Sequence, residues 1–134
     1  MKRILLVDDE PHVMRITRLA LENSGYRVDE AANGLQALEY FQDHHPDVMI
    51  TDIDMPRMNG YDLCMKIKEN MPDRRFRIYV LTSRAEDEYR DLSTVVDDLK
   101  FIEKPVSVRQ LLASLDEYFA EMEAGEKQSC RAER

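Results

Sequence analysis

The sequence predicts an α/β fold in which helices cover both faces of a doubly wound parallel sheet. Short apolar runs alternate along the chain with segments of helical periodicity, which is the pattern of repeated strand, helix and strand units. The apolar runs are nearly continuous, as expected for strands that are buried on both faces. A length of 134 residues with 43% hydrophobic residues fits a single domain with one core.

Four of the five predicted strands end in polar side chains. These side chains are, in chain order, Asp8 and Asp9 after residues 4–7, Asp52 after residues 48–50, Thr82 and Ser83 after residues 78–81, and Lys104 after residues 101–103. The remaining strand, residues 26–30, alternates apolar and polar residues and is expected at an edge. Ligands of an open parallel sheet bind at the carboxyl ends of its strands, so these groups are expected to meet.

The expected cluster favours phosphoryl transfer. Three neighbouring carboxylates repel one another unless a cation joins them, and hard oxygen ligands suit Mg²⁺. Asp52 ends the central strand, and Met55–Pro56 then turns the chain away, because the residue before a proline is disfavoured in the helical region. Asp52 is therefore the candidate nucleophile, and the metal and Lys104 are expected to neutralise the transferred group.

Helices are expected between the strands. Pro11 fits the first turn of a helix over residues 11–24, with Val13, Ile16 and Ala20 on its apolar face and Gly25 as its stop. Asn33 can cap the second helix. The apolar side of that helix is formed by Leu35, Ala37, Leu38 and Phe41, and that of the third helix, which ends near Asn70, by Leu63, Cys64 and Ile67.

The last two helices differ in their apolar content. The fourth, about residues 86–96, has a thin buried stripe, which predicts a mobile helix; its members are Ala85, Tyr89, Leu92 and Val95. Ser107 and Gln110 form a capping box for the fifth, whose apolar residues continue to Met122. We therefore expect a domain over residues 1–122 and a flexible, frayed tail over residues 123–134.

The ordered set of motifs resembles the receiver domain of bacterial two-component response regulators. The motifs are LLVDDE, DIDMPRMNG, LTS and KP, and the resemblance covers about residues 2 to 122. It implies a flavodoxin-like fold of five strands in the order 2-1-3-4-5 with five helices. It also implies a phosphoacceptor switch, which is not an enzyme beyond its own phosphorylation and slow dephosphorylation.

The resemblance assigns a role to each site residue. Asp52 accepts the phosphoryl group, Mg²⁺ is held by Asp8, Asp9, Asp52 and the backbone carbonyl of Asp54, Lys104 pairs with the phosphoryl oxygens, and Thr82 hydrogen-bonds to them. Phe101 matches the aromatic residue whose rotation is coupled to Thr82. Asp54 and Arg84 occupy the positions that modulate the phosphorylation and dephosphorylation rates.

The resemblance also implies the partners. The phosphoryl donor is a sensor histidine kinase or a histidine phosphotransfer protein. A downstream protein is expected on the face formed by the fourth helix, the fifth strand and the fifth helix. The net charge of −8 argues against direct nucleic-acid binding, and no apolar stretch is long enough to span a membrane or form a signal peptide, so we expect a cytoplasmic protein. Two cysteines imply no disulfide framework.

Two alternatives remain open from the sequence. Asp52–Ile53–Asp54 also mimics the nucleophile pair of haloacid dehalogenase-type phosphohydrolases, but Pro56 departs from that pattern and the pair Asp8–Asp9 precedes the nucleophile. We expect a stand-alone receiver, and the second alternative is a receiver domain taken from a longer regulator with an output domain.

Overall fold

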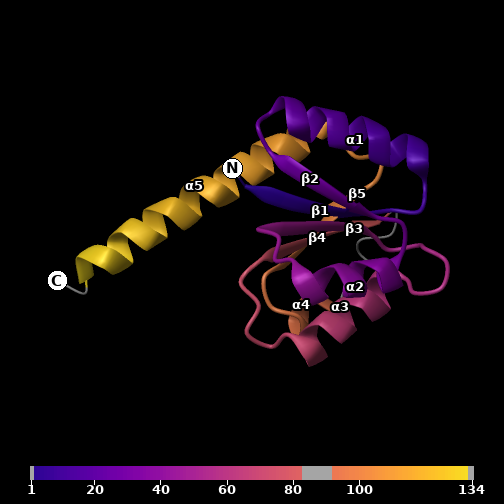
Figure 1. Cartoon of the computed structure of the whole chain (residues 1–134). Coiled ribbons are helices and arrows are strands. Elements are labelled where there is room, and N and C mark those ends of the chain that lie inside the picture. Colours follow the sequence, from indigo (N-terminus) through magenta and orange to yellow (C-terminus); the bar gives the residue numbers. More distant parts are fainter. Residues whose placement is uncertain (1, 83–91, 133–134) are drawn as a thin grey trace.

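The computed structural model describes residues 2–82 and 92–132, and for residues 93–94 and 125–132 it describes the backbone alone. It contains a five-stranded parallel sheet with the order β2-β1-β3-β4-β5 (Figure 1), which confirms the predicted order. The strands are β1 (Arg3–Val7), β2 (Arg27–Ala31), β3 (Val48–Asp52), β4 (Arg77–Thr82) and β5 (Leu99–Glu103).

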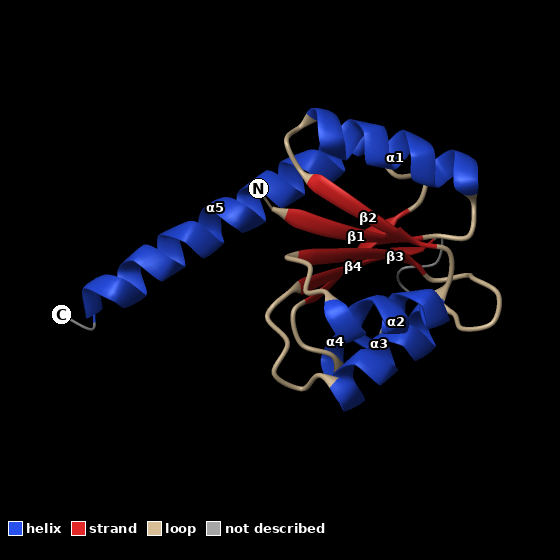
Figure 2. Ribbon diagram, in the orientation of Figure 1, coloured by secondary structure: helices blue, strands red, loops and turns tan. Residues whose placement is uncertain are grey.

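Helices cover both faces of this sheet, as predicted. Figures 1 and 2 show α1 and α5 on one face, with α2, α3 and α4 on the other. The helices are α1 (Pro11–Asn23), α2 (Gly34–Asp43), α3 (Gly60–Asn70), α4 (Leu92–Val95) and α5 (Val108–Ala132). This three-layer arrangement leaves the ends of the strands as the open edges of the fold.

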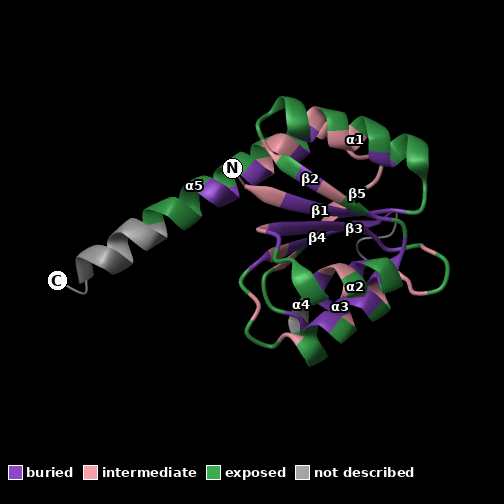
Figure 3. Cartoon of the chain, in the orientation of Figure 1, coloured by how far each residue is buried: buried purple, intermediate pink, exposed green. Residues whose placement is uncertain are grey.

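The sheet separates two hydrophobic clusters. Successive side chains of a strand point to opposite faces, so Leu5 and Val7 pack toward α2 and α3, while Ile4 and Leu6 pack toward α1 and α5. Every residue of β3 is buried, and Figure 3 shows the buried residues concentrated along the central strands. The core therefore fixes the strand that delivers Asp52.

Side-chain caps fix the beginnings of three helices. The Asn33 side chain accepts a hydrogen bond from the Gln36 backbone at 2.9 Å, and the Ser107 hydroxyl accepts one from the Gln110 backbone at 3.3 Å. Both caps were expected from the sequence. Asn59 accepts a hydrogen bond from the Asp62 backbone at 2.8 Å and caps α3 in the same way.

The predicted apolar face of α1 is wrong. Val13 and Ile16 are exposed, with Ile16 63% accessible, and the buried residues of this helix are Met14 and Leu21. Met14 and Leu21 are seven residues apart and therefore lie on one side of a helix. Leu35 on α2 is also exposed, whereas Ala37 and Phe41 are buried as expected.

Of the fourth helix expected at residues 86–96, the structure describes α4 at Leu92–Val95. Residues 86–91 of the expected helix, with Ala85 and Tyr89 of its stripe, lie outside the described residues. Leu92 is buried as predicted, but Val95 is exposed, and the adjacent Val96 is buried in its place. Leu92 and Val96 are one helical turn apart, so they share the face that packs on the core.

Helix α5 is longer than expected. It continues to Ala132, beyond the predicted boundary at residue 122, and its final turns extend away from the sheet (Figure 1). Ala, Glu, Lys and Gln are frequent in this segment and favour the helix without an apolar stripe. The flexibility of residues 123–134 stays a prediction. None of the helices in the described ranges is long and apolar enough to cross a membrane.

Candidate functional site

The carboxyl ends of β1 and β3 bring three carboxylates together. Asp8 follows β1, and its backbone N–H donates to the Ala31 carbonyl at 3.1 Å, which holds the chain at the sheet edge. Asp52 is the last residue of the buried strand β3. One oxygen from each of Asp8, Asp9 and Asp52 lies within 4.8 Å of the others. The structure thus joins three acids that the sequence placed on different segments.

Lys104, which follows β5, joins the acidic cluster through Asp52. Its backbone N–H donates to the Thr82 carbonyl at 2.9 Å, which ties the residue after β5 to the end of β4. Its Nζ atom donates to Oδ1 of Asp52 at 2.7 Å. The Asp52 side chain is 5% exposed, so this ion pair is partly shielded from water. Lys104 is therefore held directly beside the proposed nucleophile.

The electrostatics of the site follow from burial and from crowded acids. Burial raises the pKa of the Asp8 carboxyl above its usual value, and the charges of Asp52 and Asp9 act in the same direction. Burial lowers the pKa of Lys104, but the hydrogen bond to Asp52 and the surrounding carboxylates outweigh it, so the net shift is upward. Lys104 is thereby kept protonated, and the acids keep an unbalanced negative charge.

This donor set fits a hard divalent cation. Three carboxylates within a few ångströms of one another can each supply an oxygen ligand. Asp9 is exposed, whereas Asp8 and Asp52 are buried, so the cluster is open to solvent on one side. A bound cation would relieve the repulsion from Asp52 and Asp9, which adds to the effect of burial on the pKa of Asp8.

Thr82 and Phe101 lie on adjacent strands next to the cluster. Thr82 is buried at the end of β4 and pairs in register with Glu103 of β5. Phe101 pairs with Val80, which is two residues before Thr82. Because side chains alternate along a strand, Phe101 and Thr82 share one face of the sheet, the face toward α3 and α4. A rearrangement at Thr82 can therefore reach Phe101 without crossing the sheet.

The loop after β3 is held against the strand by Gly60. The Gly60 N–H donates to the Ile53 carbonyl at 2.8 Å, and a Cβ at this position would lie 2.4 Å from the Asp52 carbonyl oxygen. Any larger residue would push the loop away from Asp52. Asp54, in this loop, is exposed, and its charge contributes to the raised pKa of Lys104. Arg84 lies outside the described residues.

A groove beside Asp52 was not foreseen from the sequence. It has a volume of about 610 Å³ and is lined by residues of α1 and of the segment from β5 to α5, with Asp52 and Lys104 also in its lining. Val13 and Ile16 line the groove on α1, and Pro105 and Val106 line it across from them. The sequence carried a signal for this surface, because a stripe through Met14 and Leu21 leaves Val13 and Ile16 free to face outward.

Comparison with protein family models matches residues 4–116 to the response regulator receiver domain. Among curated proteins, the chain is 36% identical over 124 residues to response regulator Rre1 of Synechocystis, covering 90% of this chain and 53% of that protein. It is 34% identical over 115 residues to response regulator MprA of Mycobacterium ulcerans, covering 84% of this chain and 48% of MprA. The chain thus spans about half the length of these curated relatives.

Two solved structures share both the fold and substantial sequence. The receiver domain protein from Methanospirillum hungatei has a TM-score of 0.82 at 31% identity, covering 93% of this chain and 98% of that one. The Thermotoga maritima response regulator TrrA, determined in complex with Mg²⁺ and BeF, has a TM-score of 0.73 at 33% identity, covering 87% of this chain and 98% of TrrA.

Proposed function

Because this chain belongs to the response regulator receiver domain family, we propose that it is a two-component switch phosphorylated on Asp52. The observation that carries the proposal is the ion pair between Asp52 and Lys104 at the edge of the acidic cluster. Among the residues that the structure describes, Asp52 alone combines burial, a lysine partner and a place at the end of the central strand. These features are what a carboxylate nucleophile needs in a phosphoryl-transfer site.

The proposed reaction transfers one phosphoryl group from a phosphohistidine. A carboxylate oxygen of Asp52 forms a bond to phosphorus, the bond between phosphorus and the histidine nitrogen breaks, and its electron pair stays on the imidazole. Lys104 is close enough to Asp52 to balance charge on the phosphoryl oxygens. The Thr82 hydroxyl is proposed to hydrogen-bond to one of those oxygens once they are present.

We propose Mg²⁺ as the cofactor, with Asp8, Asp9, Asp52 and the backbone carbonyl of Asp54 as ligands. The carboxylate cluster and the Mg²⁺ complex of TrrA support this choice. When bound, the ion supplies positive charge for the oxygens of the transferred group. Asp8 and Asp9 would hold the ion beside Asp52, Lys104 lies on Asp52 as a second cation, and burial of Asp8 and Asp52 limits the access of water.

The groove beside Asp52 is the proposed docking surface for the phosphoryl donor, a sensor histidine kinase or a histidine phosphotransfer protein. Exposed apolar side chains next to a reactive group mark an interaction site. Val13, Ile16 and Pro105 are available to pack against a donor helix while its histidine approaches Asp52. Burying one such aliphatic side chain contributes about 1.5–3 kcal/mol, enough to influence partner affinity about tenfold or more.

Two charge-introducing variants test this docking surface. Ile16→Glu is expected to reduce phosphotransfer from a histidine kinase about tenfold while leaving phosphorylation by acetyl phosphate unchanged. Leu35→Glu is the matched control, because Leu35 is an exposed apolar residue on α2, on the opposite face of the sheet. Equal kinase-dependent rates for the two variants would place the donor elsewhere, and loss of acetyl phosphate labelling in Ile16→Glu would indicate a damaged site instead.

The output is proposed to be read on the face formed by α4, β5 and α5. Phe101 shares a sheet face with Thr82 and packs against the cluster that includes Leu92 of α4. Phosphorylation can bias a partner only if the two states of this face bind it differently. We propose a separate downstream protein as the reader. An output domain in the same protein is the alternative, since the chain matches about half the length of Rre1 and of MprA and the rest of each is outside the match.

A further inference from the structure

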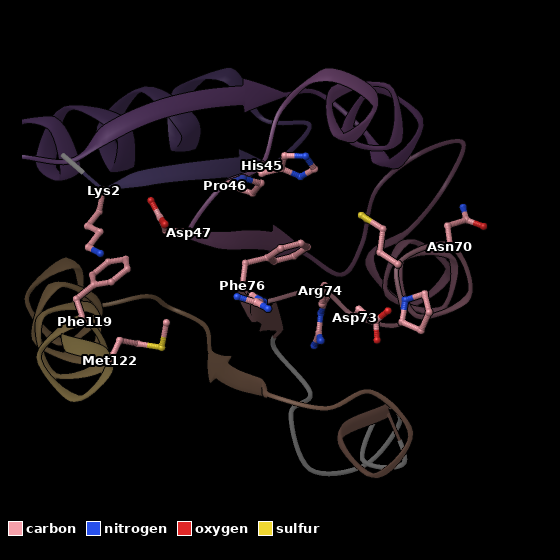
Figure 4. Close-up of a pocket in the computed structure, with 13 residues that line it drawn as sticks. Lys2, His45, Pro46, Asp47, Asn70, Asp73, Arg74, Phe76, Phe119 and Met122 are labelled. Atoms are coloured by element: carbon pink, nitrogen blue, oxygen red, sulfur yellow. The ribbon is translucent and has the colours of Figure 1, made fainter. Parts of the chain in front are cut away.

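A second cavity lies at the edge of the sheet opposite the acidic site. Lys2, Asp47 and Phe76 line it, and each immediately precedes a strand, namely β1, β3 and β4. Phe119 and Met122 of α5 form another part of the wall (Figure 4). Its volume of about 640 Å³ falls within the range of small-molecule sites. The cavity is therefore separate from the phosphoacceptor site.

The lining of this cavity is more basic than the chain as a whole. Its charged side chains of fixed sign are Lys2, Arg74 and Arg75 against Asp47 and Asp73. The whole chain, by contrast, has a net charge of −8. Asp47 is also engaged within the fold, because one of its oxygens accepts a hydrogen bond from the Arg3 backbone at 2.8 Å. The three cations therefore outnumber the acids in the lining, and this excess of positive charge favours binding of an anion.

Arg74 supplies a donor that no described residue pairs with. Its guanidinium carbon lies 5.6 Å from the centre of the Phe76 ring, and its Nη2 atom donates to the Asp97 carbonyl. Its Nε atom is buried and has no hydrogen-bond partner among the described residues. Buried donors are normally paired, and a guanidinium binds anionic oxygens particularly well. Because Arg74 lines the cavity, a turn of its side chain would bring this donor to an anionic oxygen there.

The rest of the lining is suited to an apolar group. The Nζ atom of Lys2 lies 5.5 Å from the centre of the Phe119 ring, so this wall combines a cation with an aromatic face (Figure 4). Met122 is 36% exposed beside it, and Met71 is partly exposed on the other side. Apolar walls with a few convergent polar groups are typical of ligand pockets.

We propose that this cavity binds a small organic anion with an apolar body and one sulfonate, carboxylate or phosphate group. The anionic group pairs with Arg74, and the apolar body lies against Phe119 and Met122. The ligand contacts the strand ends opposite Asp52, so binding does not require phosphorylation.

A pair of fluorescent probes tests the proposal on the full chain. The two probes are 8-anilinonaphthalene-1-sulfonate and N-phenyl-1-naphthylamine, which has the same ring system without the sulfonate. Arg74→Gln is expected to weaken binding of the sulfonate about tenfold or more and to leave the neutral probe within about twofold. Arg109→Gln is the control, because Arg109 is an exposed cation on α5 that does not line this cavity. Asp52→Asn should bind both probes like the wild type.

Amide chemical shifts locate the probe. The sulfonate is expected to shift residues 45–47, 70–76 and 119–122. Met122→Glu, at an exposed position on the wall, is expected to lose sulfonate binding even if Arg74→Gln proves poorly folded. Shifts confined to residues 13–17 and 104–108, or unchanged sulfonate binding in Met122→Glu, would overturn the proposal. Dimerisation without probe that buries residues 70–76 would also overturn it, because a second copy would then fill the cavity.

Discussion

The Nζ atom of Lys104 lies 2.7 Å from Oδ1 of Asp52, although 52 residues separate them in the chain. The contact exists because β3 and β5 end at the same edge of a parallel sheet, on either side of β4. It holds a protonated amine beside a buried carboxylate that also belongs to the cluster of Asp8, Asp9 and Asp52. The proposed phosphorylation chemistry depends on this relationship.

Mg²⁺ is expected to stabilise the fold, because it binds the three clustered carboxylates only in the folded state. At a hundredfold excess over its dissociation constant it should add about 2.7 kcal/mol, on the order of 10 °C in melting temperature. Asp9→Asn should melt at or above the wild type without Mg²⁺ and respond less to the ion. Glu39→Gln, at an exposed site on α2, should respond like the wild type. Thermal unfolding indifferent to millimolar Mg²⁺, with Asp9→Asn less stable than the wild type, would contradict the assignment.

Asp54→Asn is expected to accelerate phosphorylation by small anionic donors. Asp54 is exposed beside the site, and its charge reaches Lys104, so it should repel an approaching phosphate. Because exposed charge pairs contribute about 0.2–1 kcal/mol, the increase should be at most about fivefold. Stopped-flow measurements with acetyl phosphate check this, and a slower variant would show that Asp54 assists the reaction.

The sequence also predicts that Arg84→Ala shortens the lifetime of phosphorylated Asp52.

Cys64 should make the fold less stable in base. Burial raises the pKa of its thiol from 9.0 to about 12, so the folded protein keeps the thiol protonated while the unfolded chain ionises above about pH 9. The stability that the protonated Cys64 thiol contributes is therefore fully present below pH 9. As the pH rises from 9 toward 12, the free energy of unfolding falls by about 1.4 kcal/mol per pH unit. Urea unfolding at pH 8, 9 and 10 should show a shallower decline for Cys64→Ala. Parallel declines for the two proteins would argue against the shifted pKa.

Phosphorylation is expected to change amide exchange in residues 83–104. Thr82 and Phe101 share one sheet face, so a change at Thr82 should reach β5 and α4. Hydrogen exchange followed by mass spectrometry, with and without acetyl phosphate, measures this response, and the Asp52→Asn protein serves as the control. Changes confined to α1 and α2 would refute the proposed output face.

The sequence predicted the site best where a reactive side chain stands at a position that the local pattern marks as the end of a strand. Asp52 follows a continuous apolar run and precedes a proline, so its place at a strand end could be predicted without the fold. The face of α1 could not, because Val13 and Ile16 are apolar at helical spacing and yet are exposed. Periodicity identifies an apolar stripe but does not distinguish packing on the sheet from an exposed interaction surface.

The lengths of elements were also harder to predict than their order. Helix α5 continues to Ala132 although residues 123–132 carry no apolar periodicity, so the apolar pattern did not predict its end. The Arg74 Nε atom, which has no partner in the described part of the chain, had no signal in the sequence, because its surroundings depend on where the loop before β4 packs. Strand order, in contrast, followed from the family resemblance and is confirmed by the pairing of all five strands.

Intact-mass spectrometry after incubation with acetyl phosphate and Mg²⁺ tests the central assignment most directly. The wild-type chain is expected to gain the mass of one phosphoryl group, and Asp52→Asn is expected to gain none. Asp54→Asn, whose substitution leaves the proposed nucleophile intact, should still be labelled. Equal labelling of the wild type and Asp52→Asn would contradict the assignment of Asp52 as the phosphoacceptor.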